Sequence, residues 1–355
     1  TIFLHSSNPL ESFPCFPIFS QLPPSTNGLA VGVGVGVGVG VEVTSVESLT
    51  GYFAVPKGMD DIRMVYDASR SGLNASIWAP NFSLPSVESL LREVDQATWM
   101  GDVDIGEMFL NFCLDPLLQE YCGVDLRPYL GGETSECTWW ERWVRCMMGL
   151  KWSPYVCIKA LLLALEWVKG DLQCTSNPFH WSKILFNLPG QEGYDPTRAW
   201  VSRMKCVKGE WTLASGMVCY VDDLRPTGSS EEDCWRVMHH ISSRLNYLGI
   251  QIALRKHRPP SRQPGAWAGS IVISNAQGVA VTCTVEKWLK AKQIVREILV
   301  EVEKGEELDR KSLERSRGFL VHVQRTYPAI TPYLKGLHLT IDSWRGGRDE
   351  EGWTG

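Results

Sequence analysis

Two adjacent carboxylates follow an apolar segment, in the string Tyr220-Val221-Asp222-Asp223. Neighbouring side chains of a strand point to opposite faces, so two successive aspartates can approach one ion only where the strand turns. Burying apolar residues beside two negative charges costs free energy unless a cation compensates. The string therefore predicts a strand and a turn that presents two carboxylates, although an ordinary Asx turn before the loop 224–229 would look the same.

A second apolar segment, upstream in the chain, also ends in a carboxylate. The strand expected at 98–103 is followed by Asp104, and Phe109 stands five residues later. If this strand and the one before Asp222 are neighbours, they gather three carboxylates at one sheet edge, Asp104, Asp222 and Asp223.

Three carboxylates at one edge suit a hard divalent cation. Mg²⁺ prefers oxygen ligands, keeps several waters and also binds substrate phosphates. Two such ions can activate a hydroxyl and stabilise an in-line displacement at phosphorus. The predicted chemistry is nucleotidyl transfer or phosphodiester hydrolysis with two Mg²⁺ ions, or with Mn²⁺ in their place.

The elements that would position these carboxylates alternate irregularly. We expect strands at 52–55, 62–66, 98–103, 216–220, 266–274 and 279–284. We expect helices at 87–94, 155–168, 230–248 and 286–304, and one more after the cap Asp309. The segment 169–215 is loosely patterned and rich in Pro and Gly, so we treat it as an insertion. This irregular order indicates an α+β or mixed α/β class.

Composition excludes several classes of protein. A chain of 355 residues with 44% hydrophobic and 10% aromatic residues can bury a core, so it is not wholly disordered, collagen-like or a disulfide knot. Its eleven cysteines include no C-x-x-C pair and are read as reduced thiols. Neither an apolar run long enough to span a membrane nor a secretory signal is evident. We therefore expect an intracellular protein, cytoplasmic or nuclear, that is not secreted and has no membrane partner.

Charge is distributed unevenly along the chain. The formal net charge of −5 argues weakly against a nucleic-acid partner. However, residues 1–253 carry 18 Lys+Arg against 28 Asp+Glu, whereas residues 254–345 carry 16 against 9. A basic C-terminal segment therefore follows an acidic body.

The order of these motifs resembles that of reverse transcriptases of LTR-type retrotransposons and retroviruses. That family carries Asp-x4-aromatic on one palm strand and aromatic-x-Asp-Asp on the next hairpin, which Asp104 with Phe109 and Tyr220 to Asp223 match. The resemblance implies that Asp104, Asp222 and Asp223 are the catalytic metal ligands. Asp102 lies seven residues before Phe109, and this spacing does not fit the motif.

The resemblance also implies a site for a deoxynucleoside triphosphate. Lys57 and Arg63 are similar to the cations of the fingers hairpin that bind the triphosphate. Phe109 is similar to the aromatic residue whose ring excludes a 2′-hydroxyl. The full expected set is Lys57, Arg63, Phe109, Ser153, Tyr220 and Lys256. A solvated hairpin would also explain the first two residues, and a basic turn would explain Lys256.

Four further residues are implied to contact the primer or template. Gly149 and Pro154 belong to a Gly-x-x-x-Ser-Pro element at a palm helix start, and helix capping alone would also explain the Ser-Pro pair. Trp267 and Gly269 stand where the family has its primer-grip hairpin, with Ala268 in place of the more common leucine.

The implied fold is α+β, a right hand with fingers, a palm of antiparallel sheet and two helices, and a helical thumb. We expect a low-complexity, disordered tail at 1–45, fingers at 46–97, palm at 98–280, thumb at 281–345 and a tail at 346–355. The palm range includes a fingers portion at 115–148 and the insertion 169–215.

The expected function is that of an RNA-directed and DNA-directed DNA polymerase. Its expected partners are an RNA or DNA template with a primer strand, together with dNTP. Two alternatives stay open: a catalytically inactive retroelement relic that only binds nucleic acid, and a metal-dependent nuclease that uses the same carboxylates.

Overall fold

The computed structural model describes residues 40–41, 46–57, 61–126, 140–305 and 308–343. The chain divides into two compact units, one formed by Thr1–Trp78 with Phe109–Pro154 and the other by Ala79–Met108 with Tyr155–Gly355. Most of the expected tail 1–45, and all of the tail 346–355, lie outside the described residues. Gly40–Val41 are described, and they pair as β1 with β6.

The first unit is built on a five-stranded sheet with the order β1-β6-β5-β2-β3. The predicted hairpin is confirmed, with β2 (Leu49–Lys57) and β3 (Asp61–Asp67) antiparallel and Tyr52 opposite Tyr66. The short strands β5 (Gly123–Asp125) and β6 (Trp140–Trp143) extend it. Tyr66 is buried, and its ring lies 4.6 Å from that of Trp143.

Short helices complete this unit. They are α1 (Leu73–Ser76), α3 (Pro116–Gln119) and a 3-10 turn at Met108–Asn111 that begins in the second unit. Asp115 caps α3, because its side chain accepts the N–H of Leu117 at 2.9 Å. Proline follows at the first helical position, where its missing N–H costs nothing.

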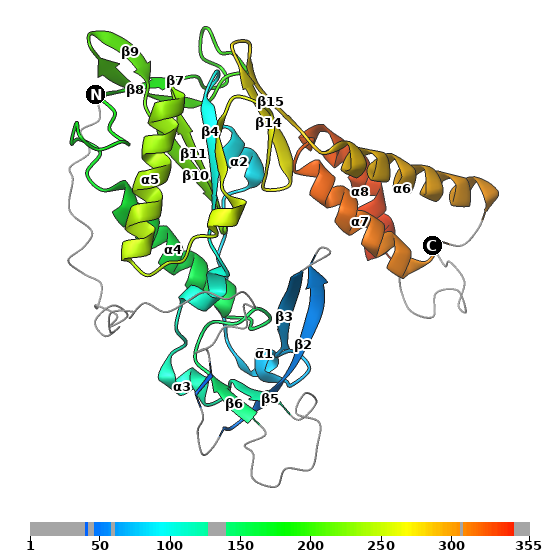
Figure 1. The fold of residues 1–355 in the computed structure, drawn as a ribbon. Helices are drawn as coiled ribbons and strands as arrows, with labels where there is room; N and C mark the ends of the chain where they lie inside the picture. Colours follow the sequence, from blue (N-terminus) through cyan, green and yellow to red (C-terminus); the bar gives the residue numbers. More distant parts are fainter. Residues whose placement is uncertain (1–39, 42–45, 58–60, 127–139, 306–307, 344–355) are drawn as a thin grey trace. The chain divides into compact units, whose positions relative to one another are not determined.

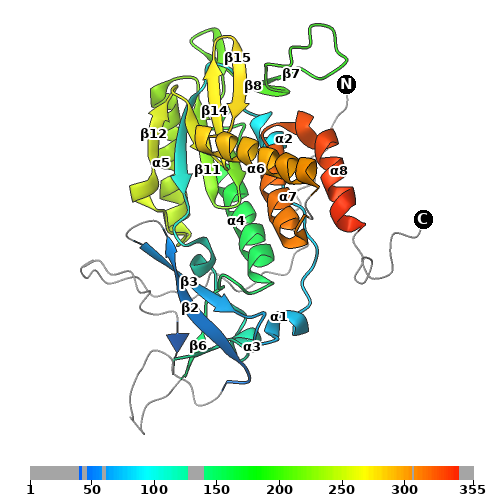
Figure 2. The ribbon, with the colours of Figure 1, turned by 90° about the vertical axis from the view of Figure 1, so that its right-hand side faces the viewer.

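The second unit contains an antiparallel sheet with the order β10-β11-β4-β12. Its strands are β10 (Gly216–Tyr220), β11 (Asp223–Gly228), β4 (Trp99–Asp104) and β12 (Arg258–Ser261). Helix α5 (Glu231–Tyr247) lies along one face (Figures 1 and 2), where Met238 approaches Gly101. Ser230, where the expected helix begins, caps it, since its side chain accepts the N–H of Asp233.

The opposite face of this sheet carries an apolar core. Met100 and Val218 pack there against α2 (Val87–Leu91), which ends earlier than predicted but begins at the expected cap, Ser86. The expected hairpin at 266–284 is a three-stranded sheet instead, formed by β13 (Gly265–Trp267), β14 (Ser270–Asn275) and β15 (Gly278–Thr282). The pair Ala268–Gly269 makes a tight turn that the sequence pattern hides, because both residues have positive φ.

The segment 169–215 was expected to be a loosely patterned insertion. It contains a third sheet of the second unit, in the order β7-β8-β9. Its strands are β7 (Lys183–Phe186), β8 (Val201–Val207) and β9 (Glu210–Leu213). Asn187 organises the long β7–β8 connection, since its amide donates to the Asp195 carbonyl and accepts the Asp195 N–H, both at 2.8 Å. Side-chain hydrogen bonds of this kind hold a loop without the apolar periodicity that would reveal its ends.

Long helices make up the rest of the described chain. Helix α4 (Ser153–Lys169) begins at the predicted Ser-Pro pair, and Ser153 accepts the N–H of Met147 at 3.2 Å. Helices α6 (Val285–Lys304) and α7 (Arg310–Gln324) match the prediction, whereas α8 (Thr331–Asp342) was not expected. Two 3-10 turns lie at Leu254–Lys256 and Pro328–Ile330. In the described ranges no helix is long and apolar enough to cross a membrane.

A buried ion cluster holds the strands of the second unit together. Asp102 of β4 accepts from Arg225 of β11 at 2.8 Å and from Arg258 of β12 at 2.6 Å. Arg225 is fully buried; it also donates to the Ala266 carbonyl at 2.9 Å and lies over the Trp267 ring. Asp102, set aside on its spacing, therefore compensates two cations from the neighbouring strands.

Replacing Asp102 with Asn should destabilise the protein by about 3 kcal/mol, because a buried guanidinium would lose its counter-charge. Urea unfolding followed by circular dichroism measures the loss. Glu166→Gln, which breaks the exposed pair with Lys169, is the matched control and should cost less than about 0.5 kcal/mol. Equal effects of the two substitutions would contradict the structural role of Asp102.

Candidate functional site

A strained two-residue turn presents the paired aspartates. Tyr220 of β10 pairs with Asp223 of β11, so Val221 and Asp222 form the connection. Val221 has φ 59°, a left-handed conformation that is rare for a β-branched residue. Backbone strain of this kind persists only where the surroundings hold it. Here the N–H of Ile105 donates to the Asp222 carbonyl at 3.2 Å and ties the turn to the end of β4.

The strand that carries Asp104 lies beside this hairpin, but next to its second strand and not next to the strand before Asp222. That second strand, β11, takes up most of the segment 224–229, which was expected to be a loop. β4 pairs antiparallel with β11, and Asp104 stands opposite Asp223. Residues opposite each other in an antiparallel pair project from the same face with Cβ atoms about 5 Å apart. Two carboxylates from distant parts of the sequence are therefore side by side, with Asp222 in the adjoining turn.

The charge of this cluster alters the titration of Asp223. Burial raises the pKa of Asp223 to about 6, and repulsion from Asp222, Asp104 and Asp102 adds to the effect of burial. Lys256 acts in the opposite direction on the pKa of Asp223. The site therefore concentrates more negative charge than its neighbouring cations offset.

Lys256 enters the cluster from the turn that follows α5. Its Nζ lies 2.6 Å from an Asp104 carboxylate oxygen, and the backbone N–H of Ala253 donates to the Asp104 carbonyl at 2.9 Å. The lysine found seven residues after Gly249 in the sequence is thus in direct contact with a carboxylate of the candidate site.

The donor set suits Mg²⁺ in its chemistry, although the side chains do not form a finished cage. Carboxylate oxygens are the ligands that Mg²⁺ and Mn²⁺ prefer. The raised pKa of Asp223 marks the uncompensated charge that a cation would relieve. Within the described ranges, however, no three His, Cys, Asp or Glu side chains are already arranged to hold a metal ion.

Three other predicted residues lie in the same unit. Tyr220 is half-buried, and its hydroxyl accepts from Arg325 at 3.4 Å. Trp267 is only 4% exposed, so its ring packs in the core. Gly269 has φ 80°, and its carbonyl accepts from Lys287 at 2.5 Å.

The remaining predicted residues belong to the first unit. Arg63 lies on β3 opposite Val55, while the Lys57 backbone pairs with Asp61 and its side chain lies outside the described residues. Phe109 is half-buried in the 3-10 turn. Pro154 is the second residue of α4, directly after the buried Ser153. The predicted site residues thus form two sets, one in each unit.

Gly149 has a structural reason to be glycine. Its φ is 104°, and a Cβ at this position would lie 2.0 Å from the Tyr66 carbonyl. Nearby, Asn74 donates to the Gly149 carbonyl at 2.8 Å and accepts the Lys151 N–H at 2.7 Å. These bonds fix the loop before α4, and they explain Gly149 without a template, whereas helix capping would explain only the Ser-Pro pair.

Sequence reasoning missed the arginines around the acidic turn. Arg225 follows Asp223 by two residues, and Asp102 precedes Asp104 by two, so the strand period places all four on one face. This period of two was a usable signal. No sequence signal pointed to Arg258 or Arg325, because their approach to the acidic turn depends on how β12 and α7 pack.

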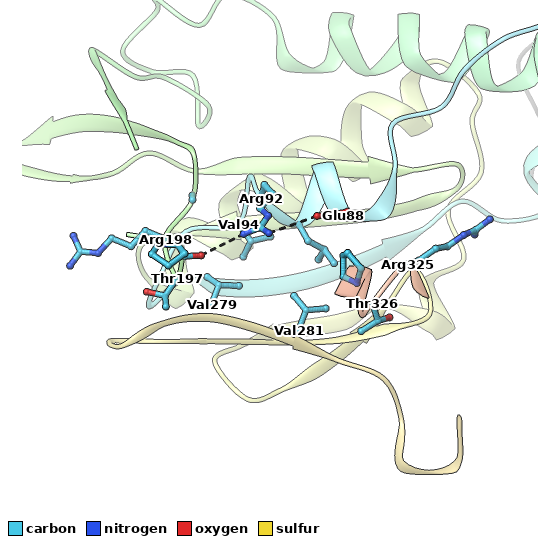
Figure 3. Close-up of a pocket in the computed structure, with 13 residues that line it drawn as sticks. Glu88, Arg92, Val94, Thr197, Arg198, Val279, Val281, Arg325 and Thr326 are labelled. Carbon is cyan, nitrogen blue, oxygen red and sulfur yellow. Dashed lines mark hydrogen bonds and ion pairs between the residues drawn. The ribbon is translucent and has the colours of Figure 1, made fainter. Parts of the chain in front are cut away.

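A small cavity lies elsewhere in the second unit (Figure 3). It has a volume of about 180 Å³ and is lined by α2, the β7–β8 connection, β15 and the segment after α7. At its edge Arg92 pairs with Glu88 at 3.7 Å and donates to the Pro196 carbonyl at 3.5 Å. None of the predicted site residues lines this cavity.

The electrostatics predict that Asp223→Asn stabilises the protein at high pH. A carboxyl whose pKa is raised on folding loses stability as pH rises through about 6, and the amide removes this loss. In EDTA the variant should gain about 1 kcal/mol at pH 8, after allowance for solvent screening, and nothing at pH 4. Thermal unfolding across this range tests it. Asp342→Asn, at an exposed carboxylate, is the control; a gain that does not change with pH would contradict the assignment.

Comparison with known proteins finds similarity at the level of structure. No family model matches the chain, and no curated protein matches it. A foamy viral protease-reverse transcriptase in complex with double-stranded DNA matches 87% of this chain and 42% of its own, with a TM-score of 0.54 and 17% identity.

Two further structures of that viral protein agree. The complex with RNA/DNA hybrid has a TM-score of 0.52 and 16% identity over 87% of this chain and 32% of its own. Another complex with double-stranded DNA has a TM-score of 0.52 and 17% identity, over 87% of this chain and 49% of its own. The chain thus spans about a third to a half of these solved chains. Its fold is of the mixed α+β class and is similar to that of a reverse transcriptase.

Proposed function

We propose that this chain is the polymerase portion of a reverse transcriptase of retroelement origin. It would extend a primer 3′-hydroxyl with dNTP on an RNA or DNA template. The observation that carries the proposal is the pairing of Asp104 with Asp223 beside the Asp222 turn. This acidic edge lies on a fold whose solved neighbours were determined with double-stranded DNA or RNA/DNA hybrid.

The acidic residues would hold two Mg²⁺ ions. Bound there, the ions would activate the primer hydroxyl and offset the charge that develops on the departing pyrophosphate. Asp222 would be the more direct ligand of the Asp-Asp pair, and Asp104 would complete the set. Lys256, now paired with Asp104 at 2.6 Å, would turn its ammonium to the pyrophosphate once a cation compensates the carboxylate.

The first unit would contribute the rest of the nucleotide site. Lys57 and Arg63 would bind the triphosphate, and Phe109 would lie under the sugar. Ser153 and Tyr220 complete the nucleotide-binding set, while Gly149, Pro154, Trp267 and Gly269 would support primer and template. Since Trp267 is buried and Gly149 is sterically required, both would act through the shape of the backbone.

A catalytically inactive nucleic-acid binder is the second candidate. Two observations favour it. In the described residues the three carboxylates do not form a finished metal cage, and Asp104 is already paired with Lys256. The two candidates differ in a single measurable property, templated synthesis.

Primer extension with Mg²⁺ and dNTP on a homopolymer template should give product, and Asp222→Asn should reduce the rate about a thousandfold or more, because a metal ligand is lost. Glu232→Gln, at an exposed carboxylate on α5, is the control and should retain activity. Template binding without any extension would support the inactive binder. Strand cleavage without added nucleotides would indicate a nuclease.

Sugar selection provides an independent test. Phe109→Val should admit ribonucleotides, because the smaller side chain leaves room for a 2′-hydroxyl. The ratio of kcat/KM for dNTP and NTP should fall by about tenfold or more. Unchanged discrimination would remove the role assigned to this ring.

A further inference from the structure

Helix α6 presents a second apolar surface in addition to the one that packs in its own unit. Its inner side contributes Ala291, which is buried with Leu320 and Val323 of α7, and Ile294 beside them. Helices α7 and α8 both lie on this inner side in Figure 1. The outer side carries large exposed apolar residues, among them Leu299 at 53%. This outer side is an apolar surface that extends beyond the core shared with α7; near its N-terminal end the Trp288 ring also lies 5.4 Å from the Tyr327 ring.

The outer residues follow the spacing of a coiled-coil seam. They form a stripe with steps of three, four, three, four and three residues, consisting of Val285, Trp288, Lys292, Val295, Leu299 and Val302. Alternating steps of three and four keep a row of side chains facing a second helix. The stripe is about 26 Å long at 1.5 Å per residue. One polar residue in such a seam, here Lys292, restricts register.

Charges along α6 favour an antiparallel partner of the same kind. The half before residue 294 carries Lys287, Lys290 and Lys292 against Glu286, whereas the rest carries Glu297, Glu301 and Glu303 against Arg296 and Lys304. The helix dipole has the same sense, positive at the N-terminus and negative at the C-terminus. Two antiparallel copies would therefore bring each basic half beside an acidic one.

We propose that the outer stripe joins two copies of this chain through antiparallel α6 helices. A two-fold axis beside residues 293 and 294 sets Val285 opposite Val302 of the second copy and Trp288 opposite Leu299. Such an interface is isologous, since both copies use one self-complementary patch. A nucleic-acid backbone fits this stripe less well, because the stripe offers five apolar residues and a single cation.

A contact between two helices lies at the small end of specific interfaces. We therefore expect a dimer with a Kd of about 10 μM, measurable by sedimentation velocity of the full chain in the absence of nucleic acid. Leu299→Glu should weaken the dimer about a hundredfold or more, because each copy would bury a charge. Val300→Glu is the matched control, as Val300 is similarly exposed on α6 but lies off the stripe. Thermal unfolding checks that both variants fold.

A charge exchange tests the orientation. Lys290→Glu with Lys292→Glu should weaken the dimer about tenfold, and adding Glu297→Lys with Glu303→Lys should restore it. A parallel pairing predicts little change from the first pair of substitutions and no rescue by the second, because each half would still face a half of the same sign.

Three results would overturn the proposal. These are a monomer at 200 μM, equal effects of Leu299→Glu and Val300→Glu, and an unchanged dimer in Leu299→Glu together with lost binding of a primer–template duplex. The last result would assign the stripe to nucleic acid. The sedimentation assay of the dimer contains no template or nucleotide, so its outcome is independent of the proposed polymerase activity.

Discussion

The antiparallel pairing of β4 with β11 is the constraint on which the rest of the candidate site depends. It sets Asp104 opposite Asp223 and, one strand period further in, brings Asp102 to Arg225. A slip of one residue would send all of these side chains to the opposite face. The register is therefore also the condition for any shared cation at the sheet edge.

Charge compensation divides this face into two zones. In the interior, Asp102 is matched by Arg225 and Arg258, and such a cluster holds three strands in one register. At the edge, burial raises the pKa of Asp223, and repulsion from the neighbouring carboxylates adds to the effect. The inner zone thus supports the strands, while the outer zone retains negative charge that a bound cation would offset.

Helix α6 is apolar on more than the side that packs against α7. Its inner residues close a small core with α7, and its outer residues repeat a seam spacing. A helix that is apolar on more than one side requires more than one neighbour. The insertion sheet β7-β8-β9 is another addition to the second unit, tied to the rest where Lys205 pairs with Asp233 of α5 at 3.0 Å.

The sequence by itself determined the local elements and the chemical identity of the site. The cap Asp309, the helix starts at Ser86 and Ser230, the Ser-Pro helix start and the hairpin strands at 52–55 and 62–66 could be predicted, since each depends on neighbours within a few residues. The motif order indicated that the strand ending at Asp104 lies near the acidic turn, but the strand that pairs with it, β11, falls where a loop was expected. Only the tertiary structure decided the role of Asp102, the approach of Arg258 and the strands of the insertion. Those depend on contacts between distant segments, which leave no periodic trace in the chain.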